Sequence, residues 1–227
     1  MNNKKADFVN NYFGSIYLTI IALLQGACII LLVPYLISYF TSSQIHIANI
    51  YTVPLFLTLL IIFTVWHHYV NGILFLRWFP NIIDALIPFA VSISEFFLIT
   101  FLEYKDQPAS MNTHAWIKSL TFFLFMGSVA YFAAAIRHDP ELFINFMDKE
   151  TSFLHGKLIR RFYTRAGISM ILQGLFSIFI LIVRRDWLLW FSLIFFVQHV
   201  VVSEYIHIRQ ILPIFKKGLS ESQPEDK

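Results

Sequence analysis

The stretch that decides the fold is residues 48–104, ANIYTVPLFLTLLIIFTVWHHYVNGILFLRWFPNIIDALIPFAVSISEFFLITFLEY. It consists of two long apolar runs joined at residues 77–80, RWFP. Each run has the roughly 20 residues that a helix needs to cross the hydrocarbon core of a bilayer. Ionisable side chains well inside the runs are rare, and they include His67, His68 and Glu95. Because lipid permits no exposed irregular backbone, the stretch predicts a helical hairpin in a membrane.

The composition of the whole chain supports this interpretation. Hydrophobic residues make up 57% of it and charged residues only 14%, whereas roughly 25% charged residues is usual in soluble domains. The formal net charge of +3 is mild and indicates no basic face for nucleic acid. The single cysteine, Cys28, excludes a disulfide framework and a multi-cysteine metal site within one chain.

Six apolar segments meet the length requirement, so we expect an all-α fold, a polytopic integral membrane helix bundle. The predicted transmembrane helices span residues 12–40, 48–76, 80–103, 115–136, 166–183 and 187–208. We treat residues 1–217 as a single transmembrane helical domain. Residues 218–227, GLSESQPEDK, are polar and are expected to form a disordered tail.

Lysine and arginine gather in alternate loops, which predicts the orientation of the bundle. They lie before the first segment, between the second and third, between the fourth and fifth, and after the sixth. The positive-inside rule then places both termini in the cytoplasm, and short loops of this kind suit a cytoplasmic (inner or plasma) membrane. Arg184 and Arg185 depart from the rule, so either they are functional at the outer end or the last two segments do not fully cross.

The loop at residues 137–165 is long and basic. Its apolar residues recur at helical spacing, with charged residues on the other side, which predicts one amphipathic helix on the cytoplasmic membrane surface, interrupted near Gly156. A solvated linker packed on the bundle is the alternative. The side chains expected to dock a lipid surface or a cytoplasmic protein partner are Lys157, Arg160, Arg161 and Arg165.

Ionisable side chains at membrane depth are the candidate functional residues. His67 and His199 each lie ten residues before an arginine at the predicted cytoplasmic boundary, so at about 1.5 Å per residue they reach a similar depth. Glu95 follows Pro88, which removes a helical hydrogen bond and is tolerated where a helix lines a cavity or packs on protein. The side chains predicted to line an ion or proton path are Glu95, His67, His68, His199 and Glu204.

The same histidines allow two other interpretations. Two facing histidines at equal depth are what bis-histidine ligation of haem b requires, with His67 or His68 facing His199 and with His68 and His199 as the expected ligands. A metal could use the same nitrogens with Glu95 or Glu204. In either case the protein would be an intramembrane redox enzyme or electron carrier. Alternatively, the ionisable residues serve packing alone. The histidines would then form hydrogen bonds to neighbouring helices through Gln25, Gln173 or Gln198. Glu95 would pair with one of the buried histidines.

The leading functional hypothesis is non-enzymatic, with no metal and no cofactor. The chain has no phosphate-binding glycine loop, no H-E-x-x-H and no G-x-S-x-G. We expect a homo-oligomeric, multi-pass protein that forms or gates an ion or proton path, as a channel or transporter does, or that acts as a membrane sensor for a cytoplasmic partner. A third hypothesis is a membrane anchor for a partner protein that docks on residues 137–165.

Overall fold

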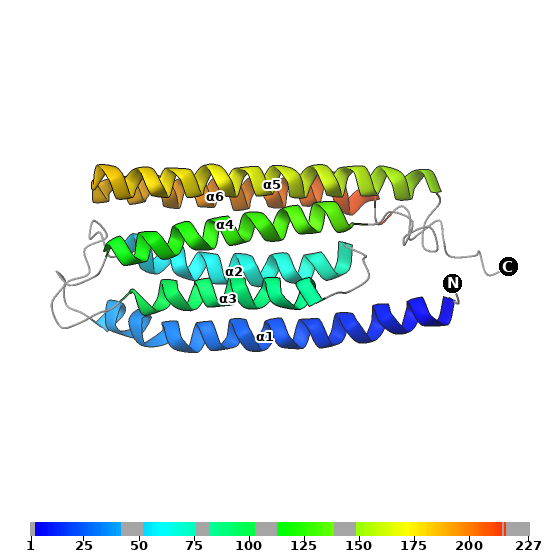
Figure 1. Cartoon of the computed structure of the whole chain (residues 1–227), viewed down its shortest axis with the longest axis horizontal. Coiled ribbons are helices and arrows are strands. Elements are labelled where there is room, and N and C mark those ends of the chain that lie inside the picture. Colours follow the sequence, from blue (N-terminus) through cyan, green and yellow to red (C-terminus); the bar gives the residue numbers. More distant parts are fainter. Residues whose placement is uncertain are drawn as a thin grey trace.

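The computed structural model describes residues 3–41, 52–75, 82–102, 113–138, 149–214 and 216. These ranges are almost entirely helical and contain no strand. A short 3-10 turn, η2 (Asp186–Leu188), precedes the last long helix, and a π-helical turn, η3 (His207–Ile211), continues it. Successive long helices run antiparallel along a common axis (Figure 1). They are α1 (Asn3–Thr41), α2 (Thr52–Phe75), α3 (Ile82–Thr100), α4 (Thr113–Arg137), α5 (Lys149–Val183) and α6 (Leu189–Ile206).

The lengths and composition of the helices are compatible with an integral membrane protein. Five helical segments are long and apolar enough to cross a bilayer: Leu18–Thr41, Thr52–Gly72, Thr113–Arg137, Lys149–Val183 and Asp186–Ile214. The apolar part of α3, Leu86–Thr100, is shorter than these. Large apolar side chains point outward, such as Ile136 at 77% and Ile182 at 73% exposure. Lipid tails would cover such a surface at no hydrophobic cost.

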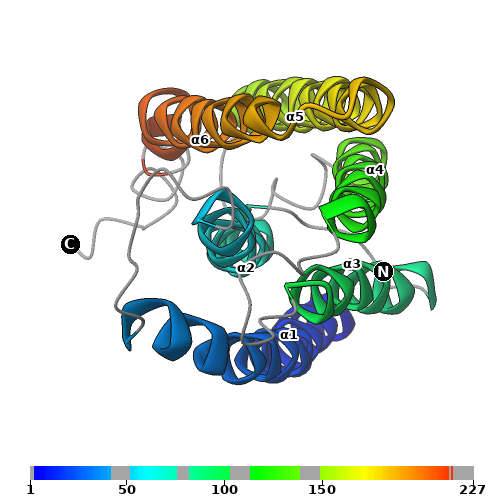
Figure 2. The same cartoon turned by 90° about the vertical axis from the view of Figure 1, so that its left-hand side faces the viewer.

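Helix α2 lies in the interior of the bundle. Figure 2 shows it between the layer of α5 and α6 and the layer of α1 and α3, and it contacts α1, α3 and α6. Its inward residues Ile61 and Ile62 are fully buried. Trp116 of α4 is buried beside it and donates a hydrogen bond through Nε1 to the Thr58 hydroxyl, at 3.3 Å. This bond satisfies the polar atom of a large side chain within an apolar core.

The most extensive helix contact joins α4 and α5, and glycines make it possible. A Cβ atom built at Gly167 would lie 3.1 Å from the Phe132 ring, and one at Gly174 would lie 3.2 Å from the Phe125 ring. A side chain at either position would require the facing phenylalanine ring to move by a few tenths of an ångström. Small residues allow the backbones to approach closely, as is common in membrane bundles.

The predicted surface helix is the main difference between sequence and structure. Lys149–Arg165 is not a separate element, because it forms the first half of α5, which runs unbroken through the buried Gly156 for 35 residues. At about 1.5 Å per residue, α5 is roughly 52 Å long, against roughly 30 Å of hydrocarbon. Several turns of α5 therefore extend beyond the apolar layer. Residues 139–148 and the predicted tail at 218–227 lie outside the described residues.

The turn between α5 and α6 lies at the opposite end of the bundle from the start of α1 (Figure 1). Arg184, with φ of 54°, and Arg185 are both exposed there. Both helices of this hairpin are long enough to cross a bilayer.

Candidate functional site

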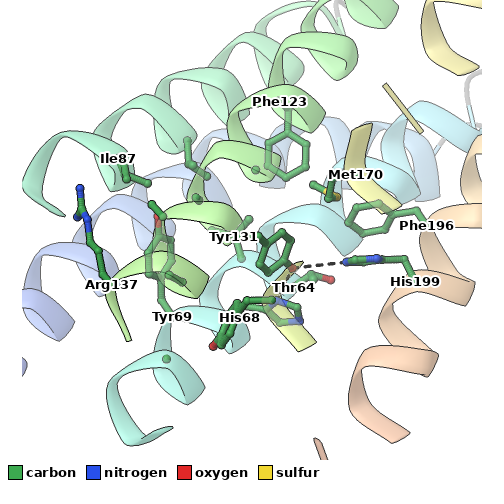
Figure 3. Close-up of a pocket in the computed structure, with 18 residues that line it drawn as sticks. Thr64, His68, Tyr69, Ile87, Phe123, Tyr131, Arg137, Met170, Phe196 and His199 are labelled. Carbon is green, nitrogen blue, oxygen red and sulfur yellow. Dashed lines mark hydrogen bonds between the residues drawn. The ribbon is translucent and has the colours of Figure 1, made fainter. Parts of the chain in front are cut away.

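A cavity of about 120 Å³ lies inside the bundle between α2, α3, α4, α5 and α6 (Figure 3). Most of its lining is apolar, and small residues of α4, Gly127 and Ala130 among them, leave the space open. Its polar side chains come from different helices. They are Thr64, His68, Tyr69, Tyr131, Arg137, Tyr163 and His199.

Tyr131 of α4 joins the two histidines of this cavity. Its hydroxyl lies 2.5 Å from His68 Nδ1, on α2, and 3.5 Å from His199 Nε2, on α6 (Figure 3). The centroids of the two imidazole rings are 6.5 Å apart. A tyrosine hydroxyl has one hydrogen to donate and also accepts, so it can bond to both rings only when one of them donates to it.

The hydrogen-bonded chain continues into α5. Ser169 Oγ lies 3.1 Å from His199 Nδ1 and accepts a hydrogen bond from Gln173 Nε2 at 3.3 Å. Gln173 and His199 are buried. We call the five side chains Gln173, Ser169, His199, Tyr131 and His68 the relay.

The bonds of the relay fit one direction throughout. Because the Gln173 amide donates to Ser169, the serine hydrogen is free to donate to His199 Nδ1. His199 then carries its own hydrogen on Nε2 and donates to Tyr131, which donates to His68 Nδ1. In this order both imidazoles carry their hydrogen on Nε2; the reverse order, with both hydrogens on Nδ1, fits the same contacts. In this order each contact of the relay has one donor and one acceptor, so a single chain of bonds connects α5 to α2.

A second polar pair lies beside the relay. His67 Nε2 is 2.7 Å from Glu204 Oε1 and 2.8 Å from Asn71 Nδ2. Both contacts fall on one ring nitrogen, which has a single lone pair or a single hydrogen. His67 Nε2 either accepts from Glu204 when that acid holds the proton, or donates to the Glu204 carboxylate. The Asn71 amide adds only a shared, weaker bond, through its N–H in the first arrangement and through its oxygen in the second. The His67 and Glu204 side chains are 43% and 31% exposed, so this pair is more accessible than the buried His199.

The predicted path residues therefore fall into three places. His68 and His199 share the cavity, His67 and Glu204 pair between α2 and α6, and Glu95 lies elsewhere, between α1 and α3. The sequence predicts that His67 and His199 meet, whereas the structure brings His68 to His199. Successive helical residues point about 100° apart, so packing decides which of two neighbouring histidines faces inward.

The hypothesis that the ionisable residues serve packing predicted other hydrogen-bond partners from those in the structure. Gln25 bonds to Glu95 rather than to a histidine, Gln173 reaches His199 only through Ser169, and Gln198 is exposed. Sequence reasoning missed Tyr131 and Ser169. Neither has a local signal, because a tyrosine or serine within an apolar helix is common and only tertiary contacts identify these two.

The relay does not fit haem between His68 and His199. The nitrogens that face each other across the cavity both bond to the Tyr131 hydroxyl. The cavity of about 120 Å³ is also smaller than the roughly 300 Å³ at which cofactor pockets begin.

No family model, no curated protein and no solved structure matches this chain. The candidate site is therefore assigned from its geometry.

Proposed function

We propose that the protein is a non-enzymatic, multi-pass membrane protein that conducts or gates protons through the relay. The observation that carries this proposal is the chain of contacts from Ser169 through His199 and Tyr131 to His68, whose longest link, from Tyr131 to His199, is 3.5 Å. It connects four helices, α5, α6, α4 and α2, across the interior of the bundle. Chains of ionisable and hydroxyl side chains are the usual means of moving protons at membrane depth.

Proton transfer along the relay follows from the direction of its bonds. A proton that reaches Ser169 displaces the serine hydrogen onto His199 Nδ1, and His199 passes its Nε2 hydrogen to Tyr131. Tyr131 passes its hydrogen to His68 Nδ1, and His68 releases the hydrogen on Nε2. Each transfer reverses the bond it uses, so the hydroxyls must rotate and the imidazoles must return to their first tautomers before the next proton passes. Gln173 holds Ser169 in its orientation and carries no proton itself.

His67 and Glu204 are proposed to exchange protons at the His68 end. The His67 and His68 rings have centroids 6.0 Å apart. The two arrangements of the His67–Glu204 pair differ in which partner holds the proton and in which way the Asn71 amide faces. A pair of this kind passes a proton at little cost when its two forms have similar free energy.

Proton flux into liposomes tests the proposal. The purified protein is reconstituted with a pH-sensitive dye inside, and a potassium gradient with valinomycin supplies the driving force. We expect faster acidification than in empty liposomes, and Tyr131→Phe should reduce it to the level of empty liposomes, because phenylalanine keeps the ring but breaks the relay. Tyr163→Phe is the matched control: Tyr163 lines the same cavity, with its ring centroid 5.9 Å from that of Tyr131, but no relay bond uses its hydroxyl. Equal flux through Tyr131→Phe and the wild type would contradict the proposal.

The membrane setting is part of the same proposal. Six helices cross a cytoplasmic membrane with both termini inside, and the protein is a homo-oligomer. The basic residues at the start of α5, Lys157, Arg160, Arg161 and Arg165, are all exposed. This supports their proposed role in docking anionic lipid headgroups or an acidic cytoplasmic partner. A partner captured by the wild type and lost when these four side chains are replaced would support docking.

A further inference from the structure

Glu95 lies apart from the relay, in the contact between α1 and α3. Its side chain has 0% exposure, and Gln25, at 2%, donates a hydrogen bond through Nε2 to Glu95 Oε2 at 2.8 Å. Cys28 Sγ is 4.0 Å from the same oxygen, the far limit for a sulfur donor. The two other oxygens of this acid and amide, Glu95 Oε1 and Gln25 Oε1, are buried and have no hydrogen-bond partner.

A bare carboxylate is unfavourable at this position. Burial removes its hydration, and none of the lysine, arginine or histidine side chains that the structure describes pairs with it. A single amide hydrogen bond does not replace the four or so that a carboxylate accepts in water. The amide oxygen of Gln25 is a second unsatisfied acceptor beside it, and two acceptors with no donor between them repel each other. The pair lacks one hydrogen.

We propose that Glu95 is a proton-binding site and that its carboxylic acid forms a reciprocal pair with the Gln25 amide. A proton on Glu95 Oε1 donates to Gln25 Oε1 after a rotation of the two terminal groups, while the bond from Gln25 Nε2 to Glu95 Oε2 is kept. Both orphaned oxygens then have partners, and the site becomes neutral. The ligand of this site is the proton itself, and it allows α1 and α3 to close over an acid. The site does not depend on the relay, because neither Glu95 nor Gln25 lines the cavity.

Infrared spectroscopy of the reconstituted protein tests this site. At neutral pH, aqueous carboxylates are ionised, so the C=O stretching band of a protonated carboxyl reports buried acids. We expect such a band in the wild type at pH 7 and its loss in Glu95→Gln, in which a neutral amide of the same shape replaces the acid. Gln25→Leu should shift the band to higher frequency, because it removes the N–H that bonds to the acid carbonyl. Cys28→Ala is the matched control and should leave the band unchanged, since its contact is long.

Isotope labelling makes the test independent of any variant's folding. Wild-type protein grown with carboxyl-labelled [13C]glutamate should show the band shifted to lower frequency. Absence of any glutamate band at pH 7, or a band whose shape and intensity are the same in Glu95→Gln as in the wild type, overturns the proposal. A band that appears only after sodium and potassium are removed also overturns it, because the carboxylate would then be holding a metal cation. Tyr131→Phe should leave the band in place while abolishing flux, so the two proposals fail separately.

Discussion

Tyr131 has one hydroxyl hydrogen and two histidine neighbours, His68 and His199. It can donate to only one of them, and this asymmetry gives the relay a direction. Ser169 takes part in setting this direction, because a hydroxyl that donates to His199 Nδ1 goes with the tautomer that donates to Tyr131. The serine is thus a positioning residue for the imidazole as well as the first carrier. Second partners of this kind set both ring orientation and tautomer in histidine sites.

Ser169→Ala should lower proton flux but leave part of it, whereas Tyr131→Phe should abolish it. Alanine leaves His199 bonded to Tyr131 and allows water to replace the lost hydroxyl, so we expect about a tenfold loss, the effect of one hydrogen bond worth roughly 1.4 kcal/mol. The dye assay in liposomes measures this loss. Ser119→Ala serves as the control, because the Ser119 hydroxyl bonds only to the Ala115 carbonyl of its own helix. Equal flux losses in Ser119→Ala and Ser169→Ala would point to general loosening of the bundle.

His138, which follows α4, should make stability fall in acid. It is only 2% exposed, and burial, with smaller effects from His155 and Arg160, lowers its pKa from 6.5 to about 3. Between these values the unfolded chain binds a proton that the folded chain rejects. Its contribution is therefore nil above pH 6.5, and stability declines as pH falls toward 3, by at most about 1.4 kcal/mol per pH unit.

Thermal unfolding in detergent between pH 7 and pH 4.5 measures this decline. His138→Gln should make the decline shallower, since glutamine binds no proton. His114→Gln, at an exposed position, is the control. An unchanged slope in His138→Gln would contradict the assignment.

The sequence predicted the histidines of the candidate site but not their hydrogen-bond partners. Histidine is rare at membrane depth, so His67, His68 and His199 are conspicuous, and the similar depth of His67 and His199 follows from counting residues. The bonds to Tyr131 and Ser169 depend on helix rotation and on the close approach of α4 to α5, neither of which a one-dimensional pattern contains. Glu95 was also conspicuous, but its partner proved to be Gln25 of α1 rather than a histidine.

At the scale of elements, the contact of α4 with α5 depends on glycines, and Gly174→Val should be destabilising. A branched side chain at Gly174 collides with the Phe125 ring, and overpacking of this kind costs about 1–3 kcal/mol. Gly26→Val in α1 makes the same chemical change where a new Cβ meets no atom within 4 Å. The difference between the melting temperatures of the two variants isolates packing from helix propensity. A Gly174→Val protein as stable as Gly26→Val would contradict the close approach.

The length of α5 could not be predicted from the sequence. The apolar part of the helix is visible in the sequence, and so is the amphipathic pattern before it. The sequence does not decide whether Gly156 ends one helix or continues it, because a glycine inside a helix costs only about 1 kcal/mol, which tertiary packing offsets. Gly156 is buried in the structure, and α5 passes through it without a break.

At the scale of the whole molecule, successive helices alternate in direction, so we expect the two ends of α5 to lie on opposite sides of the membrane. Lys157, near its start, and Arg185, just after its end, are both exposed and lie near opposite ends of the helix. If α5 crosses the bilayer, a cysteine at each position should react with a membrane-impermeant maleimide from opposite sides. The chain suits this experiment, because its one native cysteine, Cys28, is buried.

We therefore expect Lys157→Cys to be labelled only from the cytoplasmic face and Arg185→Cys only from the outer face, in sealed vesicles of known orientation. The wild type should remain unlabelled. Replacing a positive charge at position 157 or 185 alters the charge bias by one unit only, which is small beside the 17 lysines and arginines of the chain, so the orientation itself should persist. Labelling of both variants from the cytoplasmic face would mean that the α5–α6 hairpin does not cross. The relay, which draws His199, Ser169 and Gln173 from that hairpin, would then open to one side of the membrane only, and conduction across the bilayer would be ruled out in favour of proton sensing.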